Sequence, residues 1–456
     1  MKTRLLISLT CVAFVLASCK DHFEGEDQPL LHLPESTITV KDQIVIKVLQ
    51  HPQGWVTLKE TLQPQYMITQ PKREIAWMDN SFSQLSGYQP DQGWSLIDAV
   101  VHPSGHTSAI SARLDIGSND FVLRIRISRF KNDGSVAETE LTSLPNAMPP
   151  SPTYPGSIDH MKLVAFGEDL YVVARWRFNE VQAYRFSFEN NQFKLKWQKW
   201  IEPSAFVGTV GIIGGGFDNF HQGDRYFFVY ADIDRQGNLY VAVPSTEELL
   251  FDHDAFFGEN LSAEADHAAY DFGAAIVTKV SSEGNREYSK LHGGIPQSRY
   301  KRLLNMRVTD EGVFLTGRIK KNFEPDGWDA WVFAAGLDGN MLYESRIDVR
   351  QGDMFWDLDP LPGGGLLAVG TTDYTQNPAG LSVSDFRKAA AFVLDVQGNV
   401  VREIEVPQGP TDRGSEAMFV RLLKNGSVIF AGAHNAPGTH ASIYSDGFIA
   451  VRDWNL

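Results

Sequence analysis

The sequence predicts an all-β fold made of repeated four-stranded units. Glycine accounts for 39 of the 456 residues and aromatic side chains for 11% of the chain, a composition typical of many short strands joined by tight turns. Apolar runs of strand length recur throughout, whereas the 3.6-residue periodicity of long helices is scarce. In the second half of the chain these runs repeat about every 60 residues, which indicates a repeat architecture.

One complete unit spans residues 355–404 and contains two hairpins. The first hairpin reverses at residues 362–365 (Pro-Gly-Gly-Gly) and the second at residues 397–399 (Gln-Gly-Asn). Glycine and asparagine tolerate the positive φ angles of tight hairpin turns, so they mark both reversals. The unit therefore has four strands, of which the first and second form one hairpin and the third and fourth form the other.

The same two turns recur along the chain. Turns between a first and a second strand are expected at residues 103–105, 167–169, 236–238, 310–312 and 424–426. Turns between a third and a fourth strand are expected at residues 132–134, 189–191, 283–285 and 338–340. The last unit ends after its third strand, at Phe448–Val451, and has no fourth strand of its own.

A four-stranded sheet repeated around an axis is the plan of a β-propeller, and the last blade is commonly completed by a strand from the other end of the chain. Just before the first complete unit, Arg73-Glu74-Ile75 repeats the tripeptide Arg402-Glu403-Ile404 of a fourth strand. The prediction is therefore a six-bladed β-propeller over residues 71–456. In this prediction an N-terminal strand at residues 71–79 completes the sixth blade.

Residues 30–70 have no place in six blades, although residues 44–49 and 55–58 are β-type runs. They form either a small N-terminal β unit or part of a seventh blade, so a seven-bladed propeller is the alternative. The units resemble bacterial β-propeller repeat families, whose blades consist of an apolar strand, an Asp-x-x-Gly-Asn turn and a second apolar strand. This resemblance covers about residues 72–456 and implies an architecture only.

The N-terminus has the layout of a secretory signal. Lys2 and Arg4 precede an apolar run, Leu5–Ala17, that is too short to span a bilayer. The run ends in Leu-Ala-Ser-Cys at residues 16–19, which resembles the lipobox of bacterial lipoproteins. The resemblance implies a signal peptide at residues 1–18 and a diacylglyceryl group on Cys19, which would hold the protein on a membrane. An ordinary cleaved signal followed by an incidental cysteine is the alternative.

An acidic segment, Lys20–Asp27, follows Cys19. It resembles the acidic export signal of surface lipoproteins of the Bacteroidota and implies a place on the outer face of the outer membrane; a solvated linker is the alternative. Cys11 would leave with the signal, so no disulfide is expected and the fold must depend on its core. Residues 19–70 are thus expected to be a lipidated tether with a possible small β unit, followed by the propeller.

The charge of the chain limits its partners. The formal net charge is -15, and loss of Lys2 and Arg4 with the signal would make it more negative. This sign disfavours nucleic acid and anionic lipid surfaces as partners.

The two ends of the blades are expected to differ. In a propeller the first–second and third–fourth turns emerge on one face, here called the short-turn face, and all other connections emerge on the opposite, long-loop face. The long connections of this chain all fall in the second group, at residues 141–159, 200–227, 244–272, 373–387 and 434–446. The long-loop face is therefore where a partner or ligand is expected.

Two sets of residues are candidates for binding on that face. Asp252, His253 and Asp254 lie in a loop rich in carboxylates and imidazoles, but their spacing matches no established metal site. No metal or other cofactor is therefore predicted, with Ca²⁺ as a minor alternative to a solvated acidic loop. The second set is aromatic and suits sugar rings or a protein anchor, unless it plugs the axial channel: Phe217, Phe220, Trp328 and Tyr374.

No catalytic constellation is recognisable in the sequence. Gly-x-Ser-x-Gly and His-Glu-x-x-His are absent, and a lipid on Cys19 would exclude thiol chemistry. Asp357 and Asp359 share one face of a strand, which is also what a solvated strand edge shows. The chain is therefore predicted not to be an enzyme.

The functional hypothesis is a non-catalytic, outer-membrane-anchored propeller lipoprotein. It would act as a binding or scaffold subunit of a cell-envelope assembly, of the nutrient-uptake or protein-export type, with an outer-membrane protein as partner. The alternative is a protein that binds or degrades extracellular polysaccharide.

Overall fold

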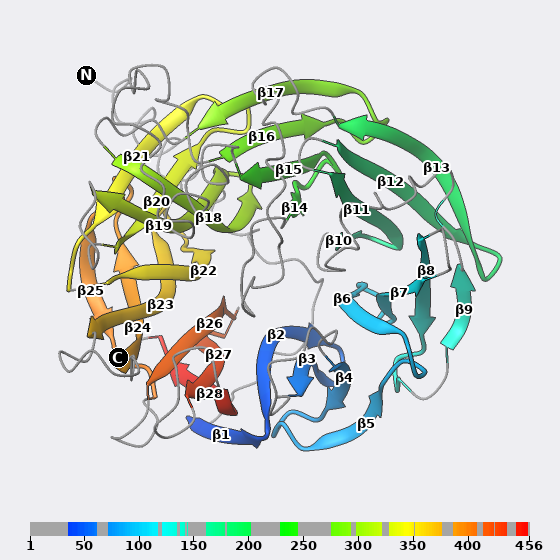
Figure 1. The fold of residues 1–456 in the computed structure, drawn as a ribbon, viewed down its shortest axis with the longest axis horizontal. Coiled ribbons are helices and arrows are strands. Elements are labelled where there is room, and N and C mark those ends of the chain that lie inside the picture. The colour runs from blue at the N-terminus through cyan, green and yellow to red at the C-terminus, as the bar shows by residue number, and fades with distance from the viewer. Residues whose placement is uncertain are drawn as a thin grey trace, which may run out of the picture.

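The computed structural model describes residues 35–61, 72–116, 121–134, 137–141, 144, 161–177, 180–201, 229–244, 275–292, 298–321, 328–350, 352–375, 386–407, 414–423, 425–435 and 444–454. In these ranges the chain forms seven four-stranded antiparallel sheets, arranged as blades around one axis (Figure 1). The protein is an all-β β-propeller with four-stranded blades.

The four strands of a blade run from the axis to the rim. The first, innermost strands are β2 (Gln43–His51), β6 (Ser95–Val101), β10 (Met161–Phe166), β14 (Tyr230–Ile233), β18 (Ser298–Thr309), β22 (Met354–Pro360) and β26 (Ser415–Leu422). The second strands are β3 (Gly54–Thr61), β7 (Thr107–Ile116), β11 (Asp169–Arg177), β15 (Leu239–Pro244), β19 (Gly312–Lys321), β23 (Leu366–Thr375) and β27 (Ser427–Asn435).

The third strands are β4 (Lys72–Met78), β8 (Phe121–Phe130), β12 (Glu180–Glu189), β16 (Ala275–Val280), β20 (Trp328–Ala335), β24 (Phe386–Leu394) and β28 (Tyr444–Asp453). The fourth, outermost strands are β5 (Gln84–Tyr88), β9 (Ala137–Leu141), β13 (Gln192–Ile201), β17 (Arg286–His292), β21 (Met341–Ile347), β25 (Val400–Ile404) and β1 (Ser36–Lys41). Blade 1 holds β2–β5, the following blades are numbered in chain order, and blade 7 holds β26–β28 with β1.

The structure corrects the number of blades from six to seven. Blade 7 is closed by β1, which pairs antiparallel with β28 from Ser36 opposite Val451 to Lys41 opposite Asp446. Residues 71–79 do not close the ring, because β4 is the third strand of blade 1. The match between residues 73–75 and residues 402–404 was therefore misleading, since it equates a third strand with a fourth.

The propeller also begins earlier than residue 71. The β-type runs at residues 44–49 and 55–58 lie in β2 and β3, the two inner strands of blade 1. The seventh-blade alternative for residues 30–70 thus agrees with the sheet topology, and a separate N-terminal β unit does not. The described residues of the turns predicted from glycine and asparagine lie between, or at the facing ends of, the strands that they were expected to join.

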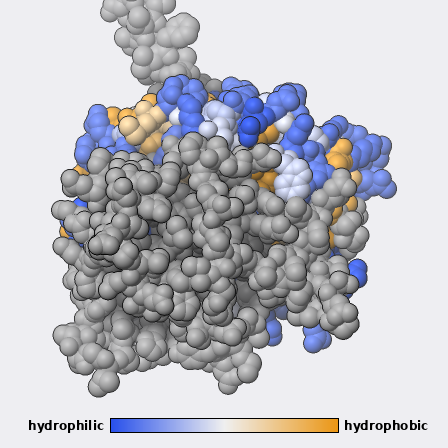
Figure 2. Space-filling view, turned by 45° about the horizontal axis from the view of Figure 1, so that its top comes forward, coloured by the Kyte–Doolittle hydropathy of each residue, from blue (hydrophilic) through white to orange (hydrophobic). Residues whose placement is uncertain are grey.

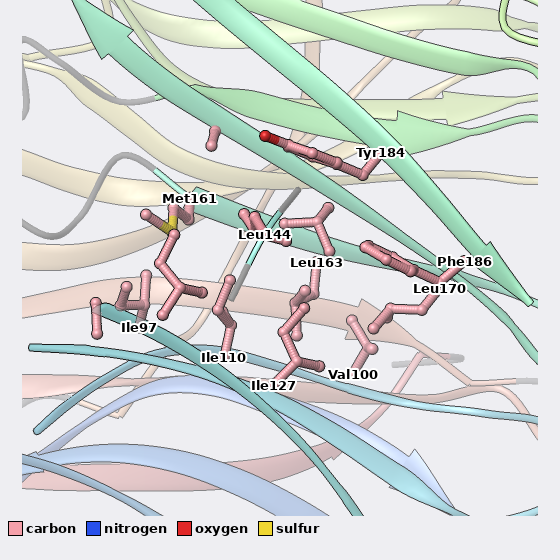
Figure 3. Packing of buried hydrophobic residues seen from close by; sticks show 14 residues of the cluster. Ile97, Val100, Ile110, Ile127, Leu144, Met161, Leu163, Leu170, Tyr184 and Phe186 are labelled. Atoms are coloured by element: carbon pink, nitrogen blue, oxygen red, sulfur yellow. The ribbon is translucent and has the colours of Figure 1, made fainter. Parts of the chain in front are cut away.

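The core lies between neighbouring blades. In one cluster, Ile97, Ile110 and Ile127 of blade 2 pack against Leu163 and Phe186 of blade 3 (Figure 3). Because both faces of a sheet are covered in this way, residues of an inner strand can be buried on both sides instead of alternating. In β6, for example, six consecutive residues are buried.

Five of the seven first strands carry a β-bulge at the same height. The residue left out of the register is Ile46 in β2, Ile97 in β6, Leu304 in β18, Trp356 in β22 and Met418 in β26. In blades 6 and 7 a glycine of the second strand lies beside the bulge. A Cβ on Gly370 would lie 1.8 Å from the carbonyl oxygen of Met354, so the bulge and this glycine belong together.

Replacing Gly370 with alanine is expected to destabilise the protein by about 1–3 kcal/mol, because the new methyl group meets backbone that must shift. Chemical unfolding in urea measures the change. Gly87→Ala is the matched control, since a Cβ there meets chiefly the flexible side chain of Gln84, on an outer strand. Equal stability of the two variants would contradict the prediction.

Candidate functional site

The strand order gives each blade two different ends. Neighbouring strands are antiparallel, so the first–second and third–fourth turns lie at one end and all other connections leave from the opposite end. The short turns are well formed. In the β14–β15 turn, for example, the Asp234 carboxylate accepts hydrogen bonds from the backbone N–H groups of Gln236 at 3.0 Å and Asn238 at 2.9 Å.

Most residues predicted to bind a partner lie outside the described ranges. This holds for Cys19, Phe217, Phe220 and the loop residues Asp252, His253 and Asp254. Trp328 begins β20 and Tyr374 lies next to the end of β23, and for both the structure describes the backbone alone. Both strand ends belong to the long-loop face, and the binding role of the two residues stays a prediction.

Among the residues that the structure describes, no three His, Cys, Asp or Glu side chains are grouped so that they could hold a metal ion. None of the described elements is a helix that is long and apolar enough to cross a membrane.

The richest polar cluster in the described part lies along the axis. The inner edge of each first strand has no neighbour in its own sheet, so its backbone groups need other partners. Carboxylates of the preceding blade supply them. The backbone N–H groups of Leu163, Val308 and Val420 donate to Asp98 at 3.0 Å, Asp232 at 2.8 Å and Asp357 at 3.0 Å, respectively.

The same three carboxylates also hold their own strands. The second oxygen of each accepts a hydrogen bond of 2.9 Å from the next backbone N–H: Ala99 for Asp98, Ile233 for Asp232 and Leu358 for Asp357. One side chain thus fixes a first strand and joins it to the next blade. This use of a carboxylate recurs in blades 2, 4 and 6.

Two of these carboxylates also bind a cationic side chain from the blade that precedes their own. Arg307 in β18 contacts both oxygens of Asp357, at 3.2 and 3.3 Å, and donates to the carbonyl of Leu358 at 3.3 Å. Lys47 in β2 contacts Asp98 at 2.9 Å in the same manner. We call the whole set the axial clasp: Lys47, Asp98, Asp232, Asn305, Arg307, Asp357, Asp359 and Arg421.

Blades 6 and 7 are joined twice. Besides the bond from Val420 to Asp357, the Asp359 carboxylate accepts from the backbone N–H of Leu422 at 2.6 Å and from Arg421 at 2.9 Å. Asp357 is 1% exposed and Asp359 is 6% exposed. The reading of these two residues as a solvated strand edge is therefore wrong, because both carboxylates are buried between blades.

Burial and neighbouring charges have opposite effects on the pKa values of the clasp residues. Burial would raise the pKa of Asp98, but Lys47 and Lys162 outweigh it and hold that pKa below its usual range. For Asp232 and Asp359 burial wins, and the pKa of each is raised. Burial would lower the pKa of Arg307, but the neighbouring carboxylates raise it.

The clasp is built to join blades. Both oxygens of Asp357 are occupied by donors from blades 5, 6 and 7, which leaves its carboxylate no role as a general base. The sequence contained a signal for the clasp, which was missed: a single carboxylate inside an apolar first strand, as in Leu96-Ile97-Asp98-Ala99. Its partners lie more than fifty residues away and became visible in the fold.

Two serine–histidine pairs also escaped the sequence analysis. Ser108 lies 2.8 Å from Nε2 of His102 near the short-turn face, and Ser415 lies 2.9 Å from Nδ1 of His434 at the long-loop ends of β26 and β27. Nδ1–H of His102 donates to the carbonyl of Gly167 at 3.1 Å, so Nε2 accepts from the serine. Both serines are buried, which removes them from contact with a substrate.

His102 predicts a loss of stability in mild acid. Burial, together with Arg129, lowers the pKa of His102 to about 4, whereas an unfolded histidine has a pKa of about 6.5. The unfolded state therefore takes up the proton first. Stability is expected to fall as the pH drops from about 6.5 towards 4, by up to about 3 kcal/mol from this residue.

Urea unfolding between pH 7 and pH 4 measures this contribution. His102→Gln is expected to be less stable at pH 7 but to lose less stability with acid than the unchanged protein. Parallel pH curves for the two proteins would contradict the assignment. His106→Gln is the control, because His106 lies four residues along the same hairpin and is not among the buried residues.

Comparison with known proteins identifies no family. No protein-family model and no curated protein matches the chain. Among solved structures, the β-propeller domain of the Trilobed protease from Pyrococcus furiosus is similar, with 10% identity, a TM-score of 0.43 and coverage of 91% of this chain and 96% of that one. A protein of unknown function from Bacteroides caccae has 10% identity and a TM-score of 0.34, over 80% of this chain and 93% of that one.

A third similar structure is the acylaminoacyl peptidase of Pyrococcus horikoshii, with 8% identity and a TM-score of 0.40. It is matched over 90% of this chain and 52% of its own length. Similarity at this level carries no argument about activity. The assignment of the propeller depends on the strand pairing of the protein itself.

Proposed function

We propose that the protein is a non-catalytic, lipid-anchored propeller of the outer membrane that binds a protein partner of the cell envelope through its long-loop face. The observation that carries the proposal is the inequality of the two faces. Short, hydrogen-bonded turns form one face, and every long connection of the chain leaves from strand ends on the other.

The buried state of the polar clusters supports a binding role over a catalytic one. The axial clasp uses its carboxylates between blades, and the serines of both serine–histidine pairs are buried. The lipid anchor itself depends on the sequence at residues 16–19. Together these features fit a platform that presents its long connections on one face.

Affinity capture tests the proposal. The full chain, with its own signal and a C-terminal affinity tag, is purified from detergent-solubilised membranes after cross-linking, and co-purifying proteins are identified. A variant with Asp252, His253 and Asp254 changed to alanine is expected to lose the partner. Lys131→Ala, at an exposed position of the short-turn face, is the control and is expected to retain it.

Recovery of the protein alone, or equal capture by both variants, would overturn the proposed role of the long-loop face. Retention of a polysaccharide in place of a protein would favour the alternative, a polysaccharide-binding or polysaccharide-degrading protein. A glycan panel with Phe217→Ala and Phe220→Ala would then locate the sugar site.

A further inference from the structure

The rim of the propeller carries a repeated structural feature. Six of the seven outermost strands contain a β-bulge, which lies at the second residue of the strand in five of them and at the fifth residue in β13. The residue left out of the register is Leu85 in β5, Glu138 in β9, Lys196 in β13, Glu287 in β17, Leu342 in β21 and Val401 in β25. The seventh outermost strand, β1, comes from the N-terminal end and has no such turn before it.

The bulge positions divide the rim into two arcs. In blades 1, 5 and 6 the bulge residue is apolar and exposed: Leu85 by 63%, Leu342 by 59% and Val401 by 60%. In blades 2, 3 and 4 it is charged: Glu138, Lys196 and Glu287. Single exposed apolar residues are common on protein surfaces and need no explanation. Here, however, the bulge residue is apolar in every described case on one arc and charged on the other, which is a pattern.

Further apolar side chains lie on the first of these arcs. Met341 precedes Leu342, and Val396 and Val400 lie in or beside the turn that leads to Val401; all three are exposed. In Figure 2 the described surface along the upper edge of the view is mainly hydrophilic, with small separate hydrophobic areas. Outside the arc, the outermost strands of blades 2–4 expose two large apolar side chains among the described residues, Leu195 and Trp200, both in β13.

The apolar arc spans blades 5, 6, 7 and 1, since blade 7 lies between blades 6 and 1. Its outermost strands follow one another around the rim as β21, β25, β1 and β5 (Figure 1). The strand in the middle, β1, exposes Thr37, Thr39 and Lys41, of which Lys41 alone is charged. The chain from the N-terminus thus joins the propeller at the centre of this arc.

The chain also joins on the same side as the bulges. Ser36 pairs with Val451, close to the end of β28, so β1 starts at the short-turn end of blade 7. The apolar bulge residues Leu85, Leu342 and Val401 also lie at the short-turn ends of their strands. Residues 20–35 separate this point from Cys19 and can reach at most about 55 Å when fully extended.

We propose that the short-turn side of the rim over blades 5, 6, 7 and 1 rests on the surface of a lipid bilayer. The inference depends on the lipid anchor of the proposed function and adds the orientation of the propeller. Exposed leucine, valine and methionine side chains enter the headgroup region, and the charged bulges of blades 2–4 stay in water. The long-loop face then points away from the bilayer, towards a partner.

An apolar contact is preferred to an electrostatic one. The protein has a net charge of -15, which disfavours attraction to anionic lipid. Among the outermost strands, β13 contains the most lysines and also exposes Leu195 and Trp200. It belongs to blade 3, however, on the other arc. A contact through β13 would tilt the propeller in the opposite direction, so the same experiment distinguishes the two.

Site-directed fluorescence quenching tests the orientation. The chain has two cysteines, Cys11 in the predicted signal and Cys19 in the predicted lipid site, so a single new cysteine can be labelled in the mature lipoprotein. Leu85→Cys, Leu342→Cys and Val401→Cys each receive an environment-sensitive dye. Lys196→Cys and Glu287→Cys are the matched controls, because they are the bulge residues of outermost strands in other blades.

Each labelled protein is placed in phosphatidylcholine vesicles that contain a lipid-borne quencher, and flotation of the vesicles reports the anchor independently. The expected result is emission about twofold or more lower at residues 85, 342 and 401, with little change at residues 196 and 287. Leu342→Ser combined with Val401→Ser is expected to keep flotation and to reduce quenching at residue 85.

The outcomes separate the two proposals. Flotation without quenching at any apolar bulge would overturn the orientation and leave the anchor standing. Quenching at residues 196 and 287 in place of the other three would show contact through blade 3 and overturn the proposed arc. Failure to float would overturn both the anchor and the bilayer contact. A dye shift that depends on protein concentration, without quencher, would show that a second copy of the chain covers the arc, and would also overturn the inference.

Discussion

Replacing Asp357 with alanine is expected to lower the free energy of unfolding by about 3–5 kcal/mol, the typical cost of removing one partner of a buried ion pair. Arg307 loses its contacts to both carboxylate oxygens, and the backbone N–H groups of Leu358 and Val420 lose an acceptor. Since these donors come from blades 5, 6 and 7, the damage extends over three blades. Urea unfolding at pH 7 measures the loss.

Two further variants identify the cause. Asp357→Asn keeps the shape but not the charge, so it is expected to lose a smaller part of the stability. Asp348→Ala is the control, because Asp348 is 67% exposed and its distance to Arg346 is 3.9 Å; it is expected to change stability by less than about 1 kcal/mol. A loss at Asp357 no larger than that at Asp348 would show that the clasp does not stabilise the ring.

Disrupting β1 is expected to open the ring between blades 7 and 1. Ile38 and Val40 are partly buried and pack against the core that these two blades share. Changing both to aspartate places two charges against that core, and we expect a loss of at least about 2–4 kcal/mol together with loss of β1 from β28. Hydrogen exchange of the β28 amides that bond to β1 measures the opening directly.

A control on the same strand tests whether the effect is specific to the buried side. Thr39 is exposed and lies between Ile38 and Val40, so Thr39→Asp is expected to leave β28 protected. Retained protection of β28 in the double aspartate variant would contradict closure by β1. The prediction also separates seven blades from six, since closure at residues 71–79 would leave residues 38 and 40 without effect on β28.

Local features of the blades were predictable because their causes are local. Glycine at residue 398 adopts a φ of +80°, and the Asp395 carboxylate accepts from the backbone N–H groups of Gln397 and Asn399, so that turn is encoded in five residues. The same chemistry placed the other turns correctly. The strands between these turns were predictable as well, because the positions of two chain reversals limit where the strand between them begins and ends.

The number of blades was not predictable in the same way. Whether residues 36–41 or residues 71–79 complete the last blade depends on pairing with a strand some four hundred residues away. Both segments have strand-like sequences, and a three-residue match favoured the wrong one. Contact with the Ile38 and Val40 side chains decides the question, and that contact exists once blades 7 and 1 are brought together.

The candidate sites differ in the same way, because some are recognisable from local sequence and others depend on contacts between blades. The lipid site at Cys19 and the loop residues Asp252, His253 and Asp254 stay predictions, because they lie outside the described residues. The axial clasp was present in the sequence as isolated carboxylates in apolar strands, without any sign of their partners. Its structural role is shown by the hydrogen bonds that Asp98, Asp232 and Asp357 accept from backbone N–H groups of the next blade.

By itself, the sequence determined the class of fold, the position of the short turns and the unequal length of the connections at the two ends of the blades. These follow from the residues that occupy each turn and from the spacing between turns. The tertiary structure alone decided how many blades close the ring, which strand closes it, and that carboxylates of the first strands join neighbouring blades. The physical reason is that sheet pairing and burial join residues from different blades, and their energies depend on which surfaces the closed ring brings into contact.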